Sequence, residues 1–386
     1  MQIQHLTHRH ARGWSHALPV ELDGPDTLVL AFGAPEGDDA RAALRELQAA
    51  FPASVQAGCS SAGEIAGSQV DDGSLSVAVV HFERSRLRRA GGSLHDGSDS
   101  ADLGRRLAGQ LPARLDGVAL RAVLLLAPGM DVNGAALVRG LREQLPPGVV
   151  VTGGLAGDGS RFERTWVLDD TGPAERAACA VGVYGEAVRV GHGCDGGWVD
   201  FGPERQITRS EGPVLYELDG RPALELYKNY LGDLVGQLPG SALLFPLSMR
   251  APEPGAPTLV RTILAVDEAR QSMTFAGDMP PGATVRLMRS SVDRLVDSAE
   301  EAGLRAVQAV GGAAAPPVLA VSISCIGRRL LMGERTDDEV EAVALRLPPG
   351  SVHVGFYSYG EVAPGHDSDG AELHNQTMTV TVLTEA

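Results

Sequence analysis

A stretch of thirteen residues near the start of the chain, 55–67, occurs a second time near its end, at 352–364. The copies lie 297 residues apart, and the residues they share include Gly58/Gly355, Ser61/Ser358, Gly63/Gly360 and Glu64/Glu361. In each copy an apolar run typical of a strand leads into a turn whose glycines permit positive φ and a close approach of another backbone. An internal duplication is the simplest explanation, so the chain must fold into at least two similar units.

A weaker third copy, residues 149–157, is again a β-branched run that ends in glycines. Each copy follows an apolar run and a helical pattern, and these pairs span 27–32 and 41–50, 122–127 and 135–145, and 317–324 and 337–345. The order strand, turn, helix, strand is how parallel or mixed sheets are covered by helices. The sequence therefore predicts an α/β fold in which duplicated units build mixed sheets.

Composition disfavours several classes of protein. The 386 residues, 44% of them hydrophobic, can bury a large core and indicate two or more domains. A net charge of −16 argues against nucleic-acid binding, because a phosphate-binding surface needs clustered cations. The apolar runs stay near strand length, well short of the ~20 residues of a membrane helix. Four separate cysteines, no C-x-x-C pair and no secretory signal predict a cytoplasmic protein with free thiols.

Glycine and proline mark the expected loops and one helix boundary. Residues 84–100 and 249–257 are predicted loops. Residues 219–232 predict a helix with Pro222 in its first turn and Gly232 at its end. We expect a domain boundary near this helix.

The window 191–202 combines many glycines with a histidine, a thiol and a tryptophan: His192, Cys194 and Trp198. So many glycines predict a flexible loop. This loop is the best place in the chain for groups that must move around a ligand.

Five short motifs resemble those of FIST proteins and occur in the order expected for that family. They span residues 58–65, 217–223, 324–329, 355–361 and 373–377. The resemblance extends over nearly the whole chain. It implies an N-terminal tail at 1–26, a FIST N-terminal domain at 27–220 and a FIST C-terminal domain at 221–386. FIST domains are regarded as sensory modules for small ligands that work with histidine kinases, cyclic-di-GMP enzymes or chemotaxis-type transducers.

A stand-alone FIST chain of this length is similar to the NosP group, haem-binding nitric oxide sensors that act on a separate histidine kinase. This resemblance implies a haem b whose iron is held by a histidine. His192, between two glycines and followed by Trp198 and Phe201, fits an iron ligand with aromatic walls best. Cys194 is expected near the same cofactor, and His374 is the alternative ligand. Nitric oxide would displace or lengthen the iron–histidine bond and reshape the 191–202 loop.

A second interpretation is a haem-free receptor for an amino acid or another small metabolite. The repeated turns would place Ser61, Glu64, Ser358 and Glu361 between the two halves of the chain, with Arg328 nearby. The alternative is structural, in which each glutamate caps a helix or pairs with an arginine such as Arg328. A homodimer is compatible with either interpretation.

An enzyme is the third interpretation, with Cys59 as a nucleophile in the first repeated turn. Phe356 stands at the matching position of the second copy. The chain also contains neither a phosphate-binding G-x-x-x-x-G-K-[ST] motif nor an H-E-x-x-H motif. We therefore expect a sensor rather than an enzyme.

Overall fold

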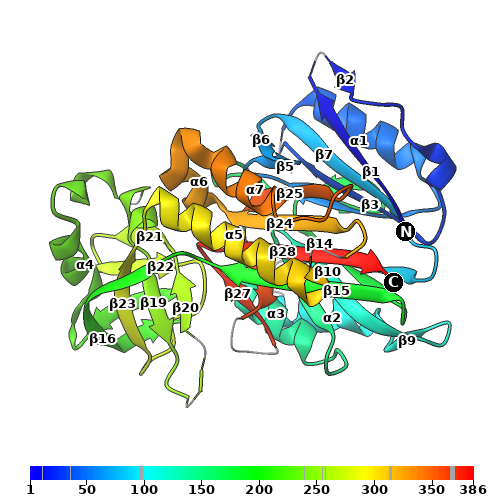
Figure 1. The fold of residues 1–386 in the computed structure, drawn as a ribbon. Helices are drawn as coiled ribbons and strands as arrows, with labels where there is room; N and C mark the ends of the chain where they lie inside the picture. Colours follow the sequence, from blue (N-terminus) through cyan, green and yellow to red (C-terminus); the bar gives the residue numbers. More distant parts are fainter. Residues whose placement is uncertain are drawn as a thin grey trace.

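Three copies of one α/β unit build the body of the protein (Figure 1). The computed structural model describes residues 1–10, 12–34, 36–94, 99–238, 240–253, 255–256, 258–312, 315–365 and 370–386. In each unit the first strand runs parallel to the second and antiparallel to the third, and a fourth strand pairs with the third. The mixed α/β fold predicted from the sequence is confirmed, and the weak copy at 149–157 belongs to a complete third unit.

The four strands lie within one stretch of chain in the first unit (2–81) and in the second (86–184), and within two stretches (188–195 and 319–385) in the third. The first unit contains β3 (Thr27–Gly33), β4 (Val55–Ser60), β7 (Ser74–His81) and β1 (Gln2–Arg9). The second contains β10 (Val118–Ala127), β11 (Val150–Leu155), β14 (Ala177–Tyr184) and β8 (Arg86–Ser93). The third contains β24 (Leu319–Cys325), β25 (Val352–Ser358), β28 (Met378–Glu385) and β15 (Val188–Asp195). Residues 2–9, within the expected tail, thus form a strand of the first sheet, between β7 and the short edge strand β2 (Gly13–Trp14).

Each unit contributes a hairpin that pairs with the sheet of another unit. Hairpin β5–β6 (Glu64–Ala66, Gln69–Asp71) of the first unit extends the third sheet by pairing with β25. Hairpin β26–β27 (Gly360–Pro364, Ala371–His374) of the third unit extends the second sheet by pairing with β11. Hairpin β12–β13 (Val167–Asp169, Gly172–Ala174) of the second unit extends the first sheet by pairing with β4. The exchange is cyclic, so the body has approximate threefold symmetry.

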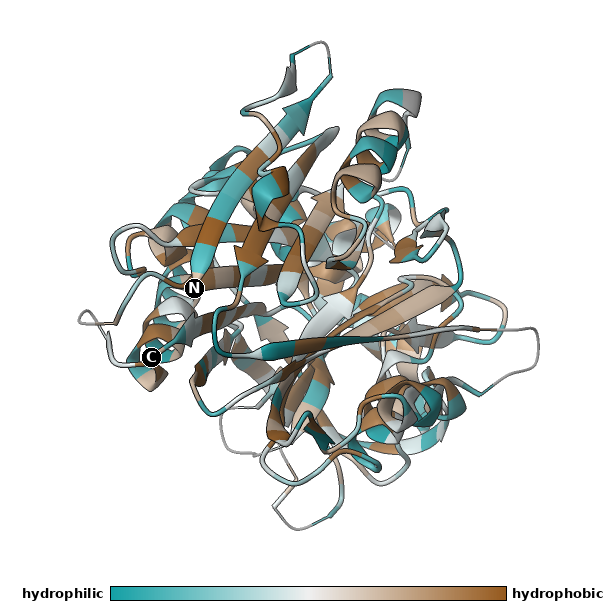
Figure 2. Ribbon diagram, turned by 90° about the vertical axis from the view of Figure 1, so that its right-hand side faces the viewer, coloured by the Kyte–Doolittle hydropathy of each residue, from teal (hydrophilic) through white to brown (hydrophobic). Residues whose placement is uncertain are grey.

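Helices cover the outer faces of the three sheets. The first sheet carries α1 (Asp38–Ala50), the second carries α2 (Ser100–Gly109) and α3 (Gly134–Arg142), and the third carries α5 (Val292–Ala309), α6 (Ile326–Met332) and α7 (Thr336–Ala344). The inner faces share one apolar core, in which the Phe32 and Phe356 rings stack 4.9 Å apart. Figure 2 shows apolar residues concentrated along the strands. The removal of this apolar surface from water is the main force that holds the units together.

Residues 199–289 form a separate lobe with its own apolar core. Its strands are β16 (Val199–Glu211), β17 (Val214–Leu218), β18 (Arg221–Pro222), β19 (Leu247–Arg250), β20 (Thr258–Arg261), β21 (Ile263–Asp267), β22 (Ser272–Phe275) and β23 (Thr284–Arg289). Helix α4 (Ala223–Leu231) packs against β17, β18 and β22. This helix, predicted at 219–232, begins four residues later than expected and is capped by Gly232 as expected. In Figure 1 the lobe lies at the side of the body away from the two chain termini.

Two predicted loops are wrong over much of their length. Residues 86–93 form strand β8, and residues 188–195 form strand β15. A Cβ atom on Gly191 would lie 2.0 Å from the Ala306 carbonyl oxygen, and one on Gly193 would lie 2.0 Å from that of Ala302. These glycines are therefore needed for direct packing of β15 against α5 and do not make the segment flexible.

The part of the 249–257 loop that the structure describes follows the prediction more closely. Strand β19 ends at Arg250, and residues 251–253 and 255–256 lie outside helices and strands, whereas Pro254 and Pro257 fall outside the described residues. Among the helices of the described ranges, none has the length and apolarity required to span a bilayer.

Candidate functional site

The repeated turns of the three units meet at the centre of the body. We call residues 60–64, 155–159 and 357–361 the three corners. The Gly157 amide donates to the Ser60 carbonyl (3.0 Å), the Ala62 amide to that of Tyr357 (2.8 Å), and the Tyr359 amide to that of Leu155 (3.1 Å). Each corner is thus bonded to the next. The three corners form a closed ring of backbone hydrogen bonds.

The glycine that precedes each corner has the same role in all three units. A Cβ atom would lie 2.1 Å from the Ala31 carbonyl oxygen at Gly58, 1.8 Å from that of Leu125 at Gly153 and 1.8 Å from that of Ser322 at Gly355. In each case that carbonyl belongs to the parallel neighbouring strand. The strongest repeated signal in the sequence therefore arises from strand packing rather than from ligand contact.

Glu64 and Glu361 are buried, and each is hydrogen-bonded within its own unit. Glu64 accepts from the Ser74 amide (2.9 Å) and hydroxyl (3.0 Å), and Glu361 accepts from the hydroxyls of Ser358 (2.6 Å) and Thr377 (2.9 Å). Burial raises the pKa of Glu64 to about 8 and that of Glu361 to about 7. Neither carboxyl group caps a helix or pairs with Arg328. Since Ser61, Glu64, Ser358 and Glu361 are at most 2% exposed, the geometry favours their structural role.

Replacement of Glu64 with glutamine should change how stability depends on pH. The folded protein holds the Glu64 proton up to about pH 8, whereas the unfolded chain releases it near the ordinary pKa of 4.5. In that window the folded state binds more protons, so the free energy of unfolding of the wild type falls as pH rises. The neutral amide removes this fall, and Glu64→Gln should gain stability relative to wild type from pH 5 to pH 8.

Urea unfolding at several pH values measures the effect. The surface variant Glu21→Gln serves as the control and should keep the wild-type pH dependence. An unchanged slope in Glu64→Gln would show that Glu64 is already ionised near neutral pH.

Arg328 has a different partner from the one expected. It is fully buried and forms an ion pair with Glu339 (2.6 Å). Its guanidinium also donates to the Leu295 and Gly196 carbonyl oxygens, each at 2.8 Å. The pairing with Glu64 or Glu361 that the sequence suggested is therefore wrong.

His192 faces a groove of about 720 Å³ between the second and third sheets. Because its neighbours Gly191 and Gly193 face α5, the His192 side chain lies on the opposite face of β15. We call this the His192 groove, and its lining includes Arg142, Leu145, Pro147, Val149, Val151 and Ala371. The imidazole is half-buried, and burial lowers its pKa, which favours the neutral ring. Among the residues that the structure describes, the His192 imidazole has no hydrogen-bond or ion-pair partner.

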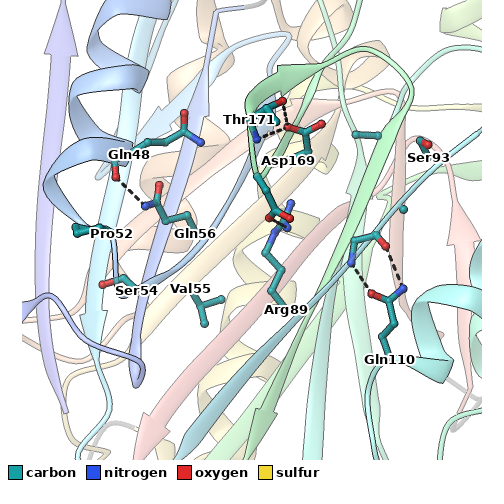
Figure 3. Close-up of a pocket in the computed structure, with 14 residues that line it drawn as sticks. Gln48, Pro52, Ser54, Val55, Gln56, Arg89, Ser93, Gln110, Asp169 and Thr171 are labelled. Carbon is teal, nitrogen blue, oxygen red and sulfur yellow. Dashed lines mark hydrogen bonds and ion pairs between the residues drawn. The ribbon is translucent and has the colours of Figure 1, made fainter.

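The threefold arrangement places Arg89 and His5 at the positions equivalent to His192. Arg89 lines a groove of about 770 Å³ (Figure 3). It donates to Asp170 (2.6 Å) and to the Leu168 carbonyl oxygen (2.6 Å). The His5 ring lies 3.5 Å from the Ser76 hydroxyl. Of these three equivalent side chains, His192 alone has no polar partner within the described ranges, which makes it the one best suited to accept a ligand.

The other residues expected around His192 lie elsewhere. Cys194 and Trp198 line a neighbouring cavity of about 270 Å³, together with His374. The Trp198 indole donates to the Gln376 carbonyl oxygen (2.8 Å), and Phe201 packs edge-on against Phe245 at 6.1 Å in the lobe. We call the smaller space the junction cavity, because it lies between the lobe and the body. The structure thus separates His192 from the aromatic residues that its sequence neighbourhood suggested.

His374 and the cysteines are poorly suited to metal binding or catalysis. The His374 ring lies 3.0 Å from the Ala363 carbonyl oxygen, and burial lowers its pKa to about 4. Burial raises the pKa of Cys194 to about 12 and that of Cys59 well above its ordinary value, so both thiols stay protonated. No group of three or more His, Cys, Asp and Glu side chains in the described part of the chain could hold a metal ion.

Two family models match the chain. The FIST N domain matches residues 27–221, and the FIST C domain matches residues 223–364. A search of curated proteins found no match. Among solved structures, PurLQS from Thermotoga maritima aligns with 9% identity and a TM-score of 0.18 over 100% of this chain and 72% of that chain, and so low a score carries no argument.

Proposed function

The chain belongs to the FIST family, with a FIST N domain followed by a FIST C domain, and we propose that it is a haem-binding nitric oxide sensor. FIST domains are sensory domains of signal transduction that bind small ligands. The proposed output is regulation of a separate partner, a sensor histidine kinase or a cyclic-di-GMP enzyme. The observation that carries the proposal is the imidazole of His192, which faces a cofactor-sized groove without a polar partner.

The residues of the His192 groove fit a haem in three respects. A neutral imidazole is the form that binds iron, and burial favours that form of His192. The groove volume of about 720 Å³ falls within the range of small-molecule and cofactor sites. Its wall is largely apolar, with Leu145, Val149 and Ala371, and Arg142 at the groove pairs with Glu372 (3.0 Å).

Bound haem would supply the iron atom at which nitric oxide binds. The chain's own contribution is to hold the His192 ring on a regular strand and to exclude water with the apolar wall. Gly191 and Gly193 bring β15 into direct backbone contact with α5, so a displacement of β15 must move α5 or separate the two elements. Helix α5 lies on the outer face of the third sheet (Figure 1). A partner protein bound to this face would respond to a displacement of α5. This rigid coupling replaces the flexible loop expected from the sequence.

His192→Ala should abolish haem binding. Haem supplied during expression should give a Soret band in the wild type that shifts on reduction and addition of nitric oxide, and the variant should lose this band. The matched control is His5→Ala, which removes the pseudo-equivalent histidine and should leave the spectrum and the haem stoichiometry unchanged. A wild-type protein without a Soret band, or a His192→Ala variant with the wild-type spectrum, would contradict the proposal.

The second candidate function is a haem-free receptor for a small metabolite, because unpaired polar side chains are buried where the lobe meets the body. Asn375, Gln376 and Thr262 each have at least one buried polar atom without a hydrogen-bond partner. Buried polar groups in folded proteins are nearly always satisfied, so such a group calls for a bound partner. The site differs from the Glu64 and Glu361 region expected from the sequence, where the carboxyl groups are satisfied by their own units.

A further inference from the structure

The groove that Arg89 lines is the threefold counterpart of the His192 groove, and we call it the Arg89 groove. Helix α1 and strand β4 of the first unit contribute to its lining, as does strand β8 of the second unit. Its volume of about 770 Å³ is close to the volume of about 720 Å³ of the His192 groove. The polar residues of its lining include Gln48, Gln56, Arg89, Gln110, Asp169 and Thr171.

The two grooves differ in the polarity of equivalent positions. Counted from the equivalent glycines that precede the corners, Gln56 occupies the place of Val151, and Ser54 occupies the place of Val149. All four side chains belong to residues that line their grooves. The apolar wall that suits a haem is therefore replaced by a polar wall, and the Arg89 groove suits a hydrophilic ligand.

The charged groups of the Arg89 groove are engaged with one another or with neighbouring polar groups. The Arg89 guanidinium donates to the Asp170 carboxylate (2.6 Å). The Asp169 carboxylate accepts from the backbone amide and from the hydroxyl of Thr171, each at 2.7 Å. A charged ligand would have to compete with these contacts for its counter-charge, whereas a neutral ligand would leave them in place.

Hydrogen-bonding capacity remains on three side chains of the lining. The Nε2 of Gln56 donates to the Phe51 carbonyl oxygen (2.7 Å), but the Oε1 of the same amide is buried without a partner. The Nε of Arg89 also has no hydrogen-bond partner. Gln48 is half-buried, and its side-chain amide has no hydrogen bond to any residue that the structure describes. Buried polar groups are nearly always satisfied, so these groups call for a polar partner.

The groups with remaining capacity lie on both sides of the Arg89 groove. Figure 3 shows Gln48 and Gln56 on one side, and Arg89 and Asp169 on the other. The lining thus offers amide donors and acceptors, a guanidinium donor and a carboxylate acceptor. A hydroxyl group is the natural partner for such a mixture, because it donates one hydrogen bond and accepts others without a charge.

We propose that the Arg89 groove binds a small neutral molecule rich in hydroxyl groups, a monosaccharide or a disaccharide. Its hydroxyls would accept from Arg89 and Gln48 and donate to Gln56 and Asp169. The volume of the groove falls within the range of small-molecule sites. A bound saccharide would touch β4 of the first unit and β8 of the second and would hold the two units together. This site goes beyond the proposed haem site and does not depend on His192.

Titration calorimetry of the full chain tests the Arg89 groove. The probes are glucose, galactose, sucrose and trehalose at millimolar concentration, compared with sodium acetate, sodium phosphate and glycine. Sugars at high concentration stabilise proteins without binding, because they are excluded from the protein surface. The criterion is therefore a saturable heat with one site per chain. We expect at least one saccharide to meet it and the charged probes to give no such heat.

Arg89→Gln should abolish saccharide binding, and Gln48→Ala should weaken it about tenfold through the loss of one hydrogen bond to the ligand. The control is Arg121→Gln. Arg121 pairs with Glu186 at the protein surface and does not line the Arg89 groove, so this variant should keep the wild-type affinity. If Arg89→Gln does not fold, Gln48→Ala provides the test, because the Gln48 side chain has no structural hydrogen bond to lose.

The absence of a saturable heat for every saccharide would overturn the proposal, as would wild-type affinity in the folded groove variants. Binding of acetate, phosphate or glycine in place of a saccharide would refute a neutral ligand. His192→Ala should bind the saccharide as the wild type does, so the haem proposal and this one can fail separately. Loss of saccharide binding in His192→Ala would place the saccharide in the His192 groove and refute the Arg89 site.

Discussion

Arg328→Gln should lower the free energy of unfolding by about 3–5 kcal/mol, the cost of removing one partner of a buried ion pair. The variant leaves the Glu339 carboxylate buried without its counter-charge. Glu339 also accepts hydrogen bonds from the hydroxyls of Ser324 (2.9 Å) on β24 and Tyr357 (2.6 Å) on β25. A displaced Glu339 side chain would therefore also weaken its contacts with these two strands of the third sheet. Urea unfolding followed by circular dichroism measures the loss.

The appropriate control is Arg335→Gln. Arg335 pairs with Asp293 (3.0 Å) and Asp338 (2.7 Å) on the surface, where water and salt screen the charges. Its urea midpoint should stay close to that of the wild type. An Arg328→Gln variant as stable as this control would mean that the buried pair does not contribute to the free energy of unfolding.

The sequence could not show that the buried Arg328 has an ion-pair partner and that the buried Arg261 has none among the described residues. Arg261 lies within the apolar run 259–266, and Arg328 lies between Gly327 and Arg329; neither pattern indicates whether the charge is paired in the folded protein. The partner of Arg328 lies eleven residues away on the next helix, whereas the missing partner of Arg261 becomes apparent only when strands from the lobe and the body meet. Charge pairing depends on tertiary distances that one sequence does not contain.

The first and second strands of each unit were predictable from the sequence. Their apolar runs are uninterrupted, and the repeated glycine-containing turn marks the end of the second strand. The fourth strand of each unit was harder to predict. Strands β8 and β15 contain glycines where helices press against them, and this composition also characterises loops. Glycine is typical both of flexible loops and of strands packed closely against a helix. Only the three-dimensional neighbours of a glycine distinguish the two cases.

The sequence identified one residue of the candidate site, His192, and did not identify the other residues of the site. The glycines around His192 singled it out, and the structure places it in a groove. Trp198 and Phe201 follow it in sequence, yet the chain enters the lobe between them and carries Phe201 away from the groove. Arg261, Thr262 and Asn375 carry no motif of their own in the argument from sequence, apart from the family segment that contains Asn375. Their signal is the absence of partners, which is a property of the folded state.

Gly355→Ala should destabilise the protein by about 3 kcal/mol or more, because overpacking against an immobile backbone cannot be relieved by a change of rotamer. The added methyl carbon would lie 1.8 Å from the Ser322 carbonyl oxygen and 3.0 Å from the Ser322 amide nitrogen. Strands β24 and β25 are hydrogen-bonded along their full length at this point, so neither can withdraw without loss of register. Gly58→Ala and Gly153→Ala should have effects of similar size, since their Cβ atoms meet the equivalent carbonyls.

Gly109→Ala provides the matched control for this substitution. Gly109 ends α2, and a Cβ atom there meets no heavy atom within 4 Å. Alanine is the better helix former, so the variant should be neutral or gain up to about 1 kcal/mol. Equal stability of Gly355→Ala and Gly109→Ala would show that the parallel strands can separate at the corner, and the repeated glycine would then have to be explained by contact with a ligand. A large loss at all three repeated glycines and none at Gly109 would instead tie the repeat to the packing of the three sheets.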